Sequence, residues 1–275
     1  YFFTASLTNG SAVITPDDID DFNQITKEQL IDGCYLQVAP TPFTESFDPI
    51  PADASGMIAE GEYVYQFESE FAGSFGLPIA IATSSGSAAL HIALLVSGVK
   101  ADDEVLIPSL TFIAPANAIR YAGAWPVFID SEPSYWQVDP QKVVDFLQQE
   151  CRWQNGELRN KASDRRVKAI LPVHVLGHPC DLEPILEIAK KWELTVVEDA
   201  SESLGATYQG RMLGSKATGG DIACFSFNGN KIITTGGGGM ILTDDEKLAD
   251  KARYLTTQAK DDPVRYIHDE IGYNF

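Results

Sequence analysis

The sequence is poor in cysteine and lacks any long apolar run. Four cysteines occur in 275 residues and no two of them form a CxxC pair, which argues against a disulfide-dense secreted scaffold and favours reduced thiols in a cytoplasmic protein. A membrane-spanning helix needs a run of about 18 or more apolar residues, and none is found. The N-terminus has no basic start of a signal peptide. Because the chain opens on Tyr1 instead of Met, we expect a fragment or a processed chain.

Basic residues are also scarce. The chain has 39 Asp and Glu but only 20 Lys and Arg, for a formal net charge of −19. This balance argues against a protein that grips nucleic-acid phosphates or an anionic membrane over a broad face. Residues 1–80 hold thirteen acids and a single base, Lys27. Prolines also interrupt this stretch, so we expect residues 1–61 to be an atypical acidic segment and residues 62–275 to be a separate domain.

The remainder of the chain alternates between short apolar runs and helical patterns. An amphipathic helix is predicted over Tyr63–Phe75, because Val64, Phe67 and Phe71 share one face. Further helices are predicted over Ser87–Ser97, Pro140–Glu150 and Leu182–Trp192, the last with Asp181 as its N-cap. The predicted strands are Ile79–Ala82, Glu104–Ile107, Pro126–Ile129, Val167–Leu171, Thr195–Glu198, Ile222–Phe227 and Met240–Thr243. This alternation predicts an α/β fold with a mostly parallel sheet covered on both faces.

Such sheets bind ligands where strands end and helices begin. The first junction reads TSSGSAALHIAL, with Thr83 to Ser87 leading into an apolar helix. Free amides and hydroxyls at a helix N-terminus suit a phosphate, although Ser and Gly in this position are more often simple caps. The motif is neither a P-loop nor GxGxxG. It therefore predicts an anion site of another kind.

The second junction, VVEDASESLGA, places Asp199 at the end of an apolar strand and Glu202 three residues later. A carboxylate at a buried strand end needs a cationic or hydrogen-bonding partner. Asp199 either caps the next segment or meets a protonated group of a ligand.

The third junction, FSFNGNKIITTGGGGMI, projects Lys231 from a polar turn. Most lysines are solvated surface charges, but a lysine directed into a cleft is a candidate nucleophile. The glycines at 236–239 precede a strand, so they indicate close backbone packing and not a nucleotide loop. The spacing of His174, His178 and Cys180 fits no zinc pattern, so we expect loop hydrogen bonding there and no metal site.

Together the three junctions supply a phosphate anchor, an acid and an amine. Pyridoxal 5'-phosphate requires this set: an anchor for its phosphate, an acid for its ring nitrogen and a lysine for its aldehyde carbon. The combination is far more specific than any one of its parts.

Residues 62–275 resemble the DegT/DnrJ family of sugar-nucleotide aminotransferases. The motifs that carry the resemblance are FESEFAGSFG, TSSGSAALHIAL, IPSLTFIAPANAI, PVHVLGHPCDLEPI, VVEDASESLGA, FSFNGNK with GGGGMI, and the closing IGYNF. The resemblance implies a three-layer, aspartate-aminotransferase-like large domain of PLP fold type I. It also implies a smaller C-terminal domain that these residues do not include. The sequence around Lys231 is most similar to the branch of the family that aminates sugar nucleotides on routes to bacterial nonulosonic acids, such as legionaminic acid.

The resemblance assigns roles to eight residues. Lys231 is implied as the catalytic Schiff-base lysine, and Asp199 as the partner of the pyridine nitrogen. The implied phosphate ligands are Ser87, Ala88 and Ser226, and Phe112 would stack on the ring. Glu202 stands near the cofactor's phenolic oxygen, where the family commonly has Gln or His. Asn274 matches a residue that family members contribute to the neighbouring subunit's phosphate site, which implies a homodimer.

The expected function is transfer of an amino group, from glutamate, to a nucleotide-linked keto-deoxy sugar, in the biosynthesis of cell-surface polysaccharide. Two alternatives stay open. A sugar dehydratase of the same fold is disfavoured because that branch replaces the lysine with histidine, whereas this chain has Lys231. A non-catalytic regulatory or partner protein that kept the fold is disfavoured by the intact cofactor residues. Without the smaller domain, we expect residues 1–275 alone to show poor turnover.

Overall fold

The computed structural model describes residues 61–215, 218, 220–262, 265 and 267–275, together with two short strands nearer the N-terminus. The chain divides into two units, Tyr1–Gly61 and Glu62–Phe275. In the first unit, β1 (Thr4–Thr8) pairs antiparallel with β2 (Ser11–Thr15). The rest of the acidic segment predicted over 1–61, including Cys34, lies outside the described residues.

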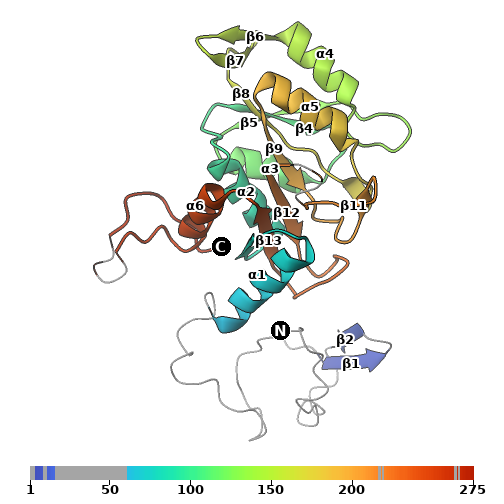
Figure 1. Ribbon diagram of the computed structural model, residues 1–275, viewed down its shortest axis with the longest axis vertical. Coiled ribbons are helices and arrows are strands. Elements are labelled where there is room, and N and C mark those ends of the chain that lie inside the picture. The colour runs from blue at the N-terminus through green and yellow to red at the C-terminus, as the bar shows by residue number, and fades with distance from the viewer. Residues whose placement is uncertain are drawn as a thin grey trace, which may run out of the picture. The chain divides into compact units, whose positions relative to one another are not determined.

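A seven-stranded sheet forms the centre of the second unit (Figure 1). Its strands, in spatial order, are β3 (Ile79–Thr83), β13 (Gly239–Thr243), β12 (Ile222–Ser226), β9 (Thr195–Asp199), β8 (Val167–Ile170), β4 (Glu104–Pro108) and β5 (Trp125–Ile129). Only β13 runs antiparallel to its neighbours in this sheet. The predicted mostly parallel α/β sheet is therefore confirmed, and the carboxyl ends of six strands meet at one edge.

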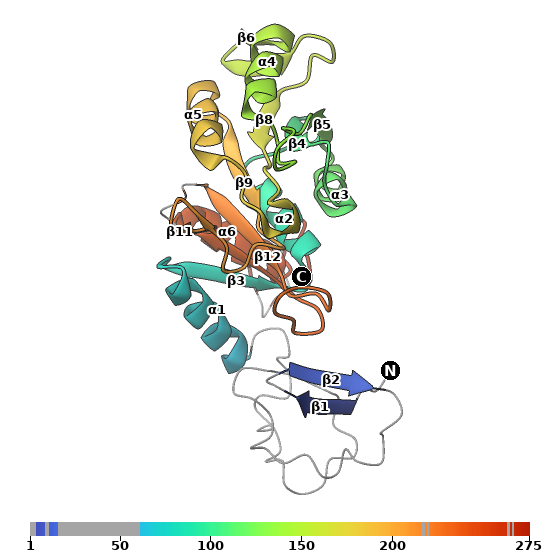
Figure 2. The ribbon, with the colours of Figure 1, turned by 90° about the vertical axis from the view of Figure 1, so that its right-hand side faces the viewer.

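Helices cover both faces of this sheet. One face carries α2 (Gly86–Val96), α3 (Ile113–Tyr121) and α6 (Glu246–Thr256), which share a buried core cluster. The other face carries α1 (Glu62–Ser74), α4 (Pro140–Glu150) and α5 (Leu182–Trp192), which bury two further clusters. Figure 2 shows α1 and α5 on one side of the sheet and α3 on the other. Adjacent residues of strands such as β4, β12 and β13 enter opposite clusters, as the period of two in a strand requires.

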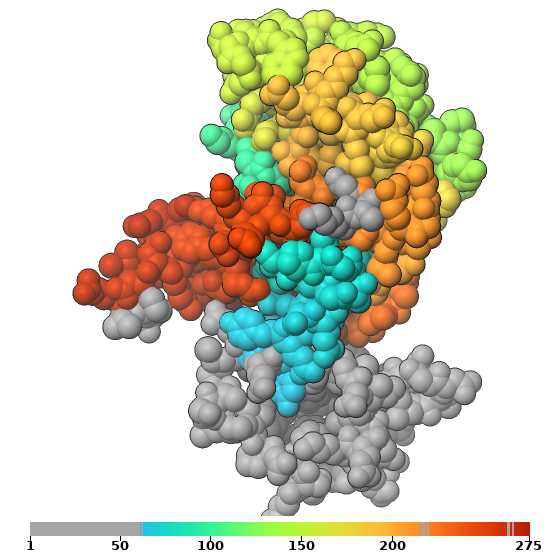
Figure 3. All heavy atoms as spheres, in the orientation of Figure 1, coloured from blue at the N-terminus to red at the C-terminus, as the bar shows by residue number. Residues whose placement is uncertain are grey.

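An ion pair joins the first and last helices of this unit. Arg253 of α6 binds the buried Glu68 of α1 at 2.7 Å, and Glu68 also accepts the amide of Ala82 in β3. Figure 3 shows the surface of α6 beside that of α1. Three elements from the two ends of the unit are thereby held together by one carboxylate.

The predicted strands and helices are confirmed to within a residue or two at their ends, but other elements were not predicted. These are α3, α6, the hairpin of β6 (Cys151–Gln154) with β7 (Glu157–Asn160), and the short pair β10 (Thr207–Tyr208) and β11 (Arg211–Met212). The predicted cap at Asp181 is wrong. Asp181 occupies the N-cap position without capping the helix, because its carboxylate accepts the hydroxyl of Tyr208 instead.

Candidate functional site

The N-terminus of α2 forms a cradle against β12. A Cβ added at Gly86 would lie 2.7 Å from the Cβ of Ser226, so only glycine fits there. The hydroxyl of Ser85 accepts the amide of Ala88 at 3.1 Å and caps the helix. The first turn of a helix leaves its other amides, that of Ser87 among them, without intrahelical partners. The first motif therefore caps the helix, and it also presents the positive helix N-terminus beside a serine hydroxyl, as an anion site requires.

Asp199 ends β9 in register with Cys224 of β12, and it is buried. Its Oδ1 accepts the amide of Ser201 at 3.0 Å. Burial raises the pKa of the Asp199 carboxyl, and the hydrogen bonds from Ser201 and the positive charges of His174 and Lys231 oppose this rise. A carboxyl in this environment is ionised more readily when a cation meets it.

Lys231 lies between a carboxylate and an aromatic ring. Its Nζ is 3.3 Å from Oε1 of Glu202 and 5.4 Å from the centroid of the Phe112 ring. The side chains of Lys231 and Glu202 are only 14% and 19% exposed, so this ion pair is largely shielded from water. The backbone amide of Lys231 donates to the carbonyl of Asn228 and closes the turn that carries it. The amine of Lys231 is therefore largely shielded and contacts both Glu202 and Phe112.

The loop that carries Lys231 is closed at its base and packed on α2. Phe227 donates to the carbonyl of Gly238 and accepts from the amide of Thr235. A Cβ at Gly239 would lie 2.4 Å from the carbonyl oxygen of Ser85. The glycine tract therefore serves close backbone packing, as predicted, and brings the lysine loop against the cap of α2.

The predicted site residues gather at the carboxyl edge of the sheet, with one exception. Direct contacts join Lys231, Glu202 and Phe112, and close packing joins Gly86 to Ser226. Asn274 is the exception, because its main chain pairs with Thr257 and its side chain is exposed. Its implied role concerns the phosphate site of a second subunit.

Sequence reasoning missed the turn η3 (Val175–Gly177) beside this cluster. The amide of Leu176 donates to Oε2 of Glu202 at 2.9 Å, while Oε1 of the same carboxylate faces Lys231. Leu176 has φ 55° and ψ 24°, a left-handed conformation that leucine rarely adopts. No periodicity or composition signal predicts such a residue, although the glycine that follows it marks a turn.

The histidine at the start of this turn is part of a hydrogen-bonded loop. Nδ1 of His174 accepts the amide of Cys180 at 3.1 Å, and Nε2 lies 3.2 Å from Oε2 of Glu198. Glu198 also accepts the amide of Gly220. This is the loop hydrogen bonding that the spacing of His174 and Cys180 predicted.

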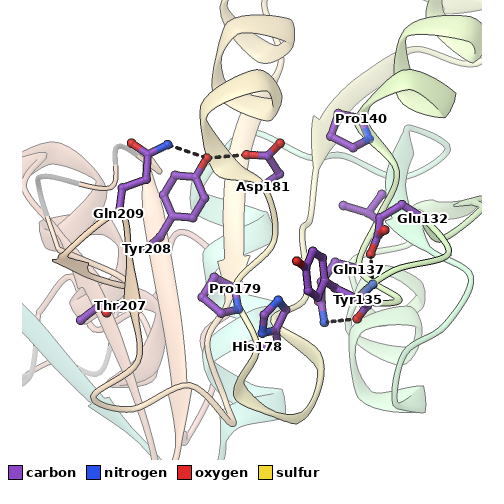
Figure 4. A pocket seen from close by; sticks show the side chains of 11 residues that line it. Glu132, Tyr135, Gln137, Pro140, His178, Pro179, Asp181, Thr207, Tyr208 and Gln209 are labelled. Atoms are coloured by element: carbon purple, nitrogen blue, oxygen red, sulfur yellow. Dashed lines mark hydrogen bonds between the residues drawn. The ribbon is translucent and has the colours of Figure 1, made fainter.

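A separate groove of about 700 Å³ opens beside the first turns of α4 and α5. Figure 4 shows the ring of Tyr135 against His178, with Tyr208 between Asp181 and Gln209. The Tyr135 and His178 rings are stacked with centroids 4.8 Å apart. None of the predicted site residues lines this groove. The hydrogen bonds of Tyr208 in this groove join its lining residues Asp181 and Gln209 to one another.

The residues at the sheet edge fit pyridoxal phosphate. The cradle at Gly86 excludes a Cβ and presents helix amides to an anion. Asp199 is a buried acid whose charged form calls for a protonated partner, as a pyridine nitrogen would provide. Lys231 supplies a sheltered amine. These three groups were predicted from separate motifs, and the fold brings them to one edge.

Comparison with known proteins agrees with this geometry. Residues 50–275 match the sequence model of the DegT/DnrJ/EryC1/StrS aminotransferase family. The GDP-perosamine synthase of Caulobacter vibrioides is 43% identical over 81% of this chain and 55% of its own length. The spore coat polysaccharide biosynthesis protein SpsC of Bacillus subtilis is 41% identical over 74% of this chain and 47% of its own length. The chain thus spans about half the length of the curated relatives it matches.

A solved structure shows the same fold with a cofactor present. NtdA from Bacillus subtilis, with bound cofactor PMP, superposes with a TM-score of 0.65 at 31% identity, covering 78% of this chain and 44% of its own.

No helix among the described residues is long and apolar enough to cross a membrane.

Proposed function

The chain belongs to the DegT/DnrJ/EryC1/StrS aminotransferase family, whose cofactor is pyridoxal 5'-phosphate, and on this premise we propose an aminotransferase function for it. The protein moves an amino group from glutamate to a nucleotide-linked keto-deoxy sugar. One observation carries the proposal: Lys231 is held in a shielded position, 3.3 Å from Glu202, at the same sheet edge as the buried acid Asp199. Lysine at this position is the group that a transaminase needs.

The names of the relatives support a guanosine diphosphate sugar as the substrate. Two relatives at 43% identity are named GDP-perosamine synthases. These names favour a GDP-linked amino sugar as the product. The sequence around Lys231 had suggested a sugar nucleotide of the nonulosonic acid pathways instead. The name of SpsC, a spore coat polysaccharide biosynthesis protein, supports a place in cell-surface polysaccharide biosynthesis.

The residues of the site divide the work of holding the cofactor. Ser87, Ala88 and the hydroxyl of Ser226 would hold the phosphate at the positive end of α2, and the amide of Ala88 would exchange its bond to Ser85 for one to the phosphate. The carboxylate of Asp199 pairs with the ring nitrogen, and Phe112 packs on the ring face. When it is bound, pyridoxal phosphate supplies an electron sink for the carbon that bears the amino group.

Lys231 has two tasks in this scheme. Its amine would hold the cofactor, and the same amine would serve as the group that moves a proton at the substrate carbon. Glu202 orients this amine, because Oε1 faces Nζ at 3.3 Å while Oε2 is fixed by the amide of Leu176. The amine is therefore positioned before any substrate arrives.

The wider organisation follows from the same family membership. Residues 62–275 form the cofactor-binding domain of a cytoplasmic homodimer, and residues 1–61 precede it as a distinct segment. Asn274 of each chain reaches the phosphate site of its partner. Its exposed side chain at the end of the described residues is compatible with this role.

Borohydride reduction tests the proposal directly. The protein is incubated with pyridoxal phosphate, reduced, digested and mapped by mass spectrometry, with Lys231→Ala as the control. We expect the label on the peptide that contains Lys231 and no label on the variant. Glutamate should also bleach the cofactor absorbance of the wild type. A label on another lysine, or none, would overturn the proposed function.

A further inference from the structure

Three side chains hold the turn at His174–His178, of which Glu198 and Gln137 are buried and Glu202 is partly exposed. Glu198 binds the ring of His174, Glu202 binds the amide of Leu176, and Gln137 binds Val175. The side chain of Gln137 is only 3% exposed. It accepts the amide of Val175 at 3.1 Å and donates to the carbonyl of the same residue at 3.3 Å. A main chain bound in this way behaves as a rigid wall.

The tip of this wall is unusual in both conformation and exposure. Leu176 adopts the left-handed region, which is unfavourable for a side chain with a Cβ, and its side chain is 74% exposed. The following residue must be glycine, because Gly177 has φ +79° and a Cβ there would lie 2.8 Å from the carbonyl of Glu202. The fold therefore maintains a strained, exposed leucine that contributes nothing to the core. Such strain persists where function uses it.

The position of this leucine relates it to the reacting groups. Its amide binds Oε2 of Glu202, and Oε1 of that carboxylate faces Nζ of Lys231. One carboxylate therefore separates the backbone of Leu176 from the lysine. On the other side of Nζ lies the half-exposed ring of Phe112. Leu176 and Phe112 therefore each contact one member of the Glu202–Lys231 pair, and each exposes apolar side-chain surface.

We propose that Leu176 is a specificity-determining residue, which makes apolar contact with the deoxy part of the sugar beside Lys231. Gln137 acts as a positioning residue that fixes the turn. This inference rests on the proposed function and adds to it an apolar group for the deoxy carbon of the sugar. Burying a leucine side chain against a ligand is worth about 1.5–3 kcal/mol, or roughly 10-fold or more in affinity.

The test compares Leu176→Gly with Glu193→Gly in the full chain loaded with pyridoxal phosphate. Glu193 is also left-handed, with φ 55° at the end of α5, so its replacement relieves the same strain away from the site. GDP-perosamine is the probe for the sugar half-reaction, and glutamate is the probe for the donor half-reaction. We expect Leu176→Gly to raise the GDP-perosamine concentration needed for half-saturation by about 10-fold or more. The glutamate concentration needed for half-saturation should stay unchanged. Glu193→Gly should change neither.

Equilibrium binding supplies a readout that does not depend on turnover. Calorimetry should measure the affinity of GDP-perosamine for Lys231→Ala and for the Lys231→Ala, Leu176→Gly double variant. We expect the double variant to bind about 10-fold or more weakly than Lys231→Ala, while its melting temperature is equal or higher. Equal affinities would overturn the inference while leaving the proposed function intact. A change of oligomeric state in Leu176→Gly, seen by light scattering, would assign Leu176 to a subunit contact and also overturn it. If the wild type fails to respond to glutamate, the proposed function itself fails; if it responds to glutamate but does not bind GDP-perosamine, the proposed substrate class fails and this inference with it.

Discussion

The ammonium of Lys231 lies 3.3 Å from one oxygen of Glu202, whose other oxygen accepts the amide of Leu176 at 2.9 Å. The carboxylate thus links the candidate catalytic amine to a strained turn from a different part of the chain. Both oxygens are engaged, so neither partner can move without loss of a hydrogen bond. This arrangement makes Glu202 a positioning group in the absence of any ligand.

Two substitutions at Glu202 should distinguish the effect of its charge on cofactor binding from the effect of its hydrogen bonds. Glu202→Gln keeps one acceptor and resembles the residue common in the family, so we expect cofactor affinity within about 3-fold of the wild type. Glu202→Ala removes both contacts and should weaken cofactor binding by about 10-fold or more, since a partly buried charged hydrogen bond contributes about 1.5–3 kcal/mol. Absorbance titration with pyridoxal phosphate measures both. Unchanged affinity in the alanine variant would show that Glu202 does not position the amine.

Asp199→Asn should stabilise the cofactor-free protein while abolishing its function. Burial raises the pKa of Asp199 above its unfolded value, so the folded state binds the proton more tightly, and the stability this gives is complete below the unfolded pKa and is lost as pH rises from there through the folded pKa. Asparagine has no charge to desolvate, so the melting temperature of the cofactor-free variant at pH 7 should equal or exceed that of the wild type. Amino transfer should fall by about 1,000-fold or more if the ring nitrogen loses its acid. A destabilised variant would mean that the Asp199 charge is already paired within the protein.

The regular elements were predictable because their signals are local. Short β-branched stretches such as the start of Thr195–Asp199 favour buried strands, and Asp199 is conspicuous as the acid that ends this one. Lys231, Phe112 and Ser87 were predicted by motif, and the fold brings their loops to one edge because parallel strands end there.

The turn at Leu176 was not predictable for the opposite reason. Its conformation is imposed by partners distant in sequence, namely Gln137 and Glu202, and no local propensity favours left-handed leucine. Asp181 shows the same override: the local pattern predicts an N-cap, but the hydroxyl of Tyr208 takes the carboxylate. Tertiary hydrogen bonds between distant loops are the part of a site that sequence periodicity does not encode.

Gly86→Ala should damage the phosphate cradle. The new Cβ would lie 2.7 Å from the Cβ of Ser226, so the helix terminus or β12 must shift. We expect cofactor affinity to fall by about 10-fold or more and the free energy of unfolding to drop by about 1–3 kcal/mol. Gly73→Ala in α1 is the matched control, because no atom lies within 4 Å of its added Cβ. Helix propensity should make that variant more stable by up to about 1 kcal/mol. Equal effects of the two substitutions would show that the cradle does not hold the phosphate.

His91 should make the fold sensitive to acid. The ring lies in α2 against Tyr273 and Phe275, with centroids at 4.9 and 5.9 Å, and its Nε2 is buried without a hydrogen-bond partner. Burial lowers the pKa of His91 below its ordinary value of 6.5, and a hydrogen bond to the main chain of Tyr121 partly opposes this. The unfolded chain therefore takes up the proton first as the pH falls. The stability associated with neutral His91 is complete above about pH 6.5 and declines below it.

His91→Phe isolates this contribution. Phenylalanine keeps the ring contacts and removes the titrating nitrogen, so its stability should depend less on pH between 7.5 and 5.5. Urea unfolding at several pH values measures the difference, which should grow by at most about 1.4 kcal/mol per pH unit in favour of the variant. His174 titrates in both proteins and cancels from that difference. Parallel stability curves would mean that His91 keeps its ordinary pKa in the fold, and that the segment at Tyr273 and Phe275 tolerates a charged ring.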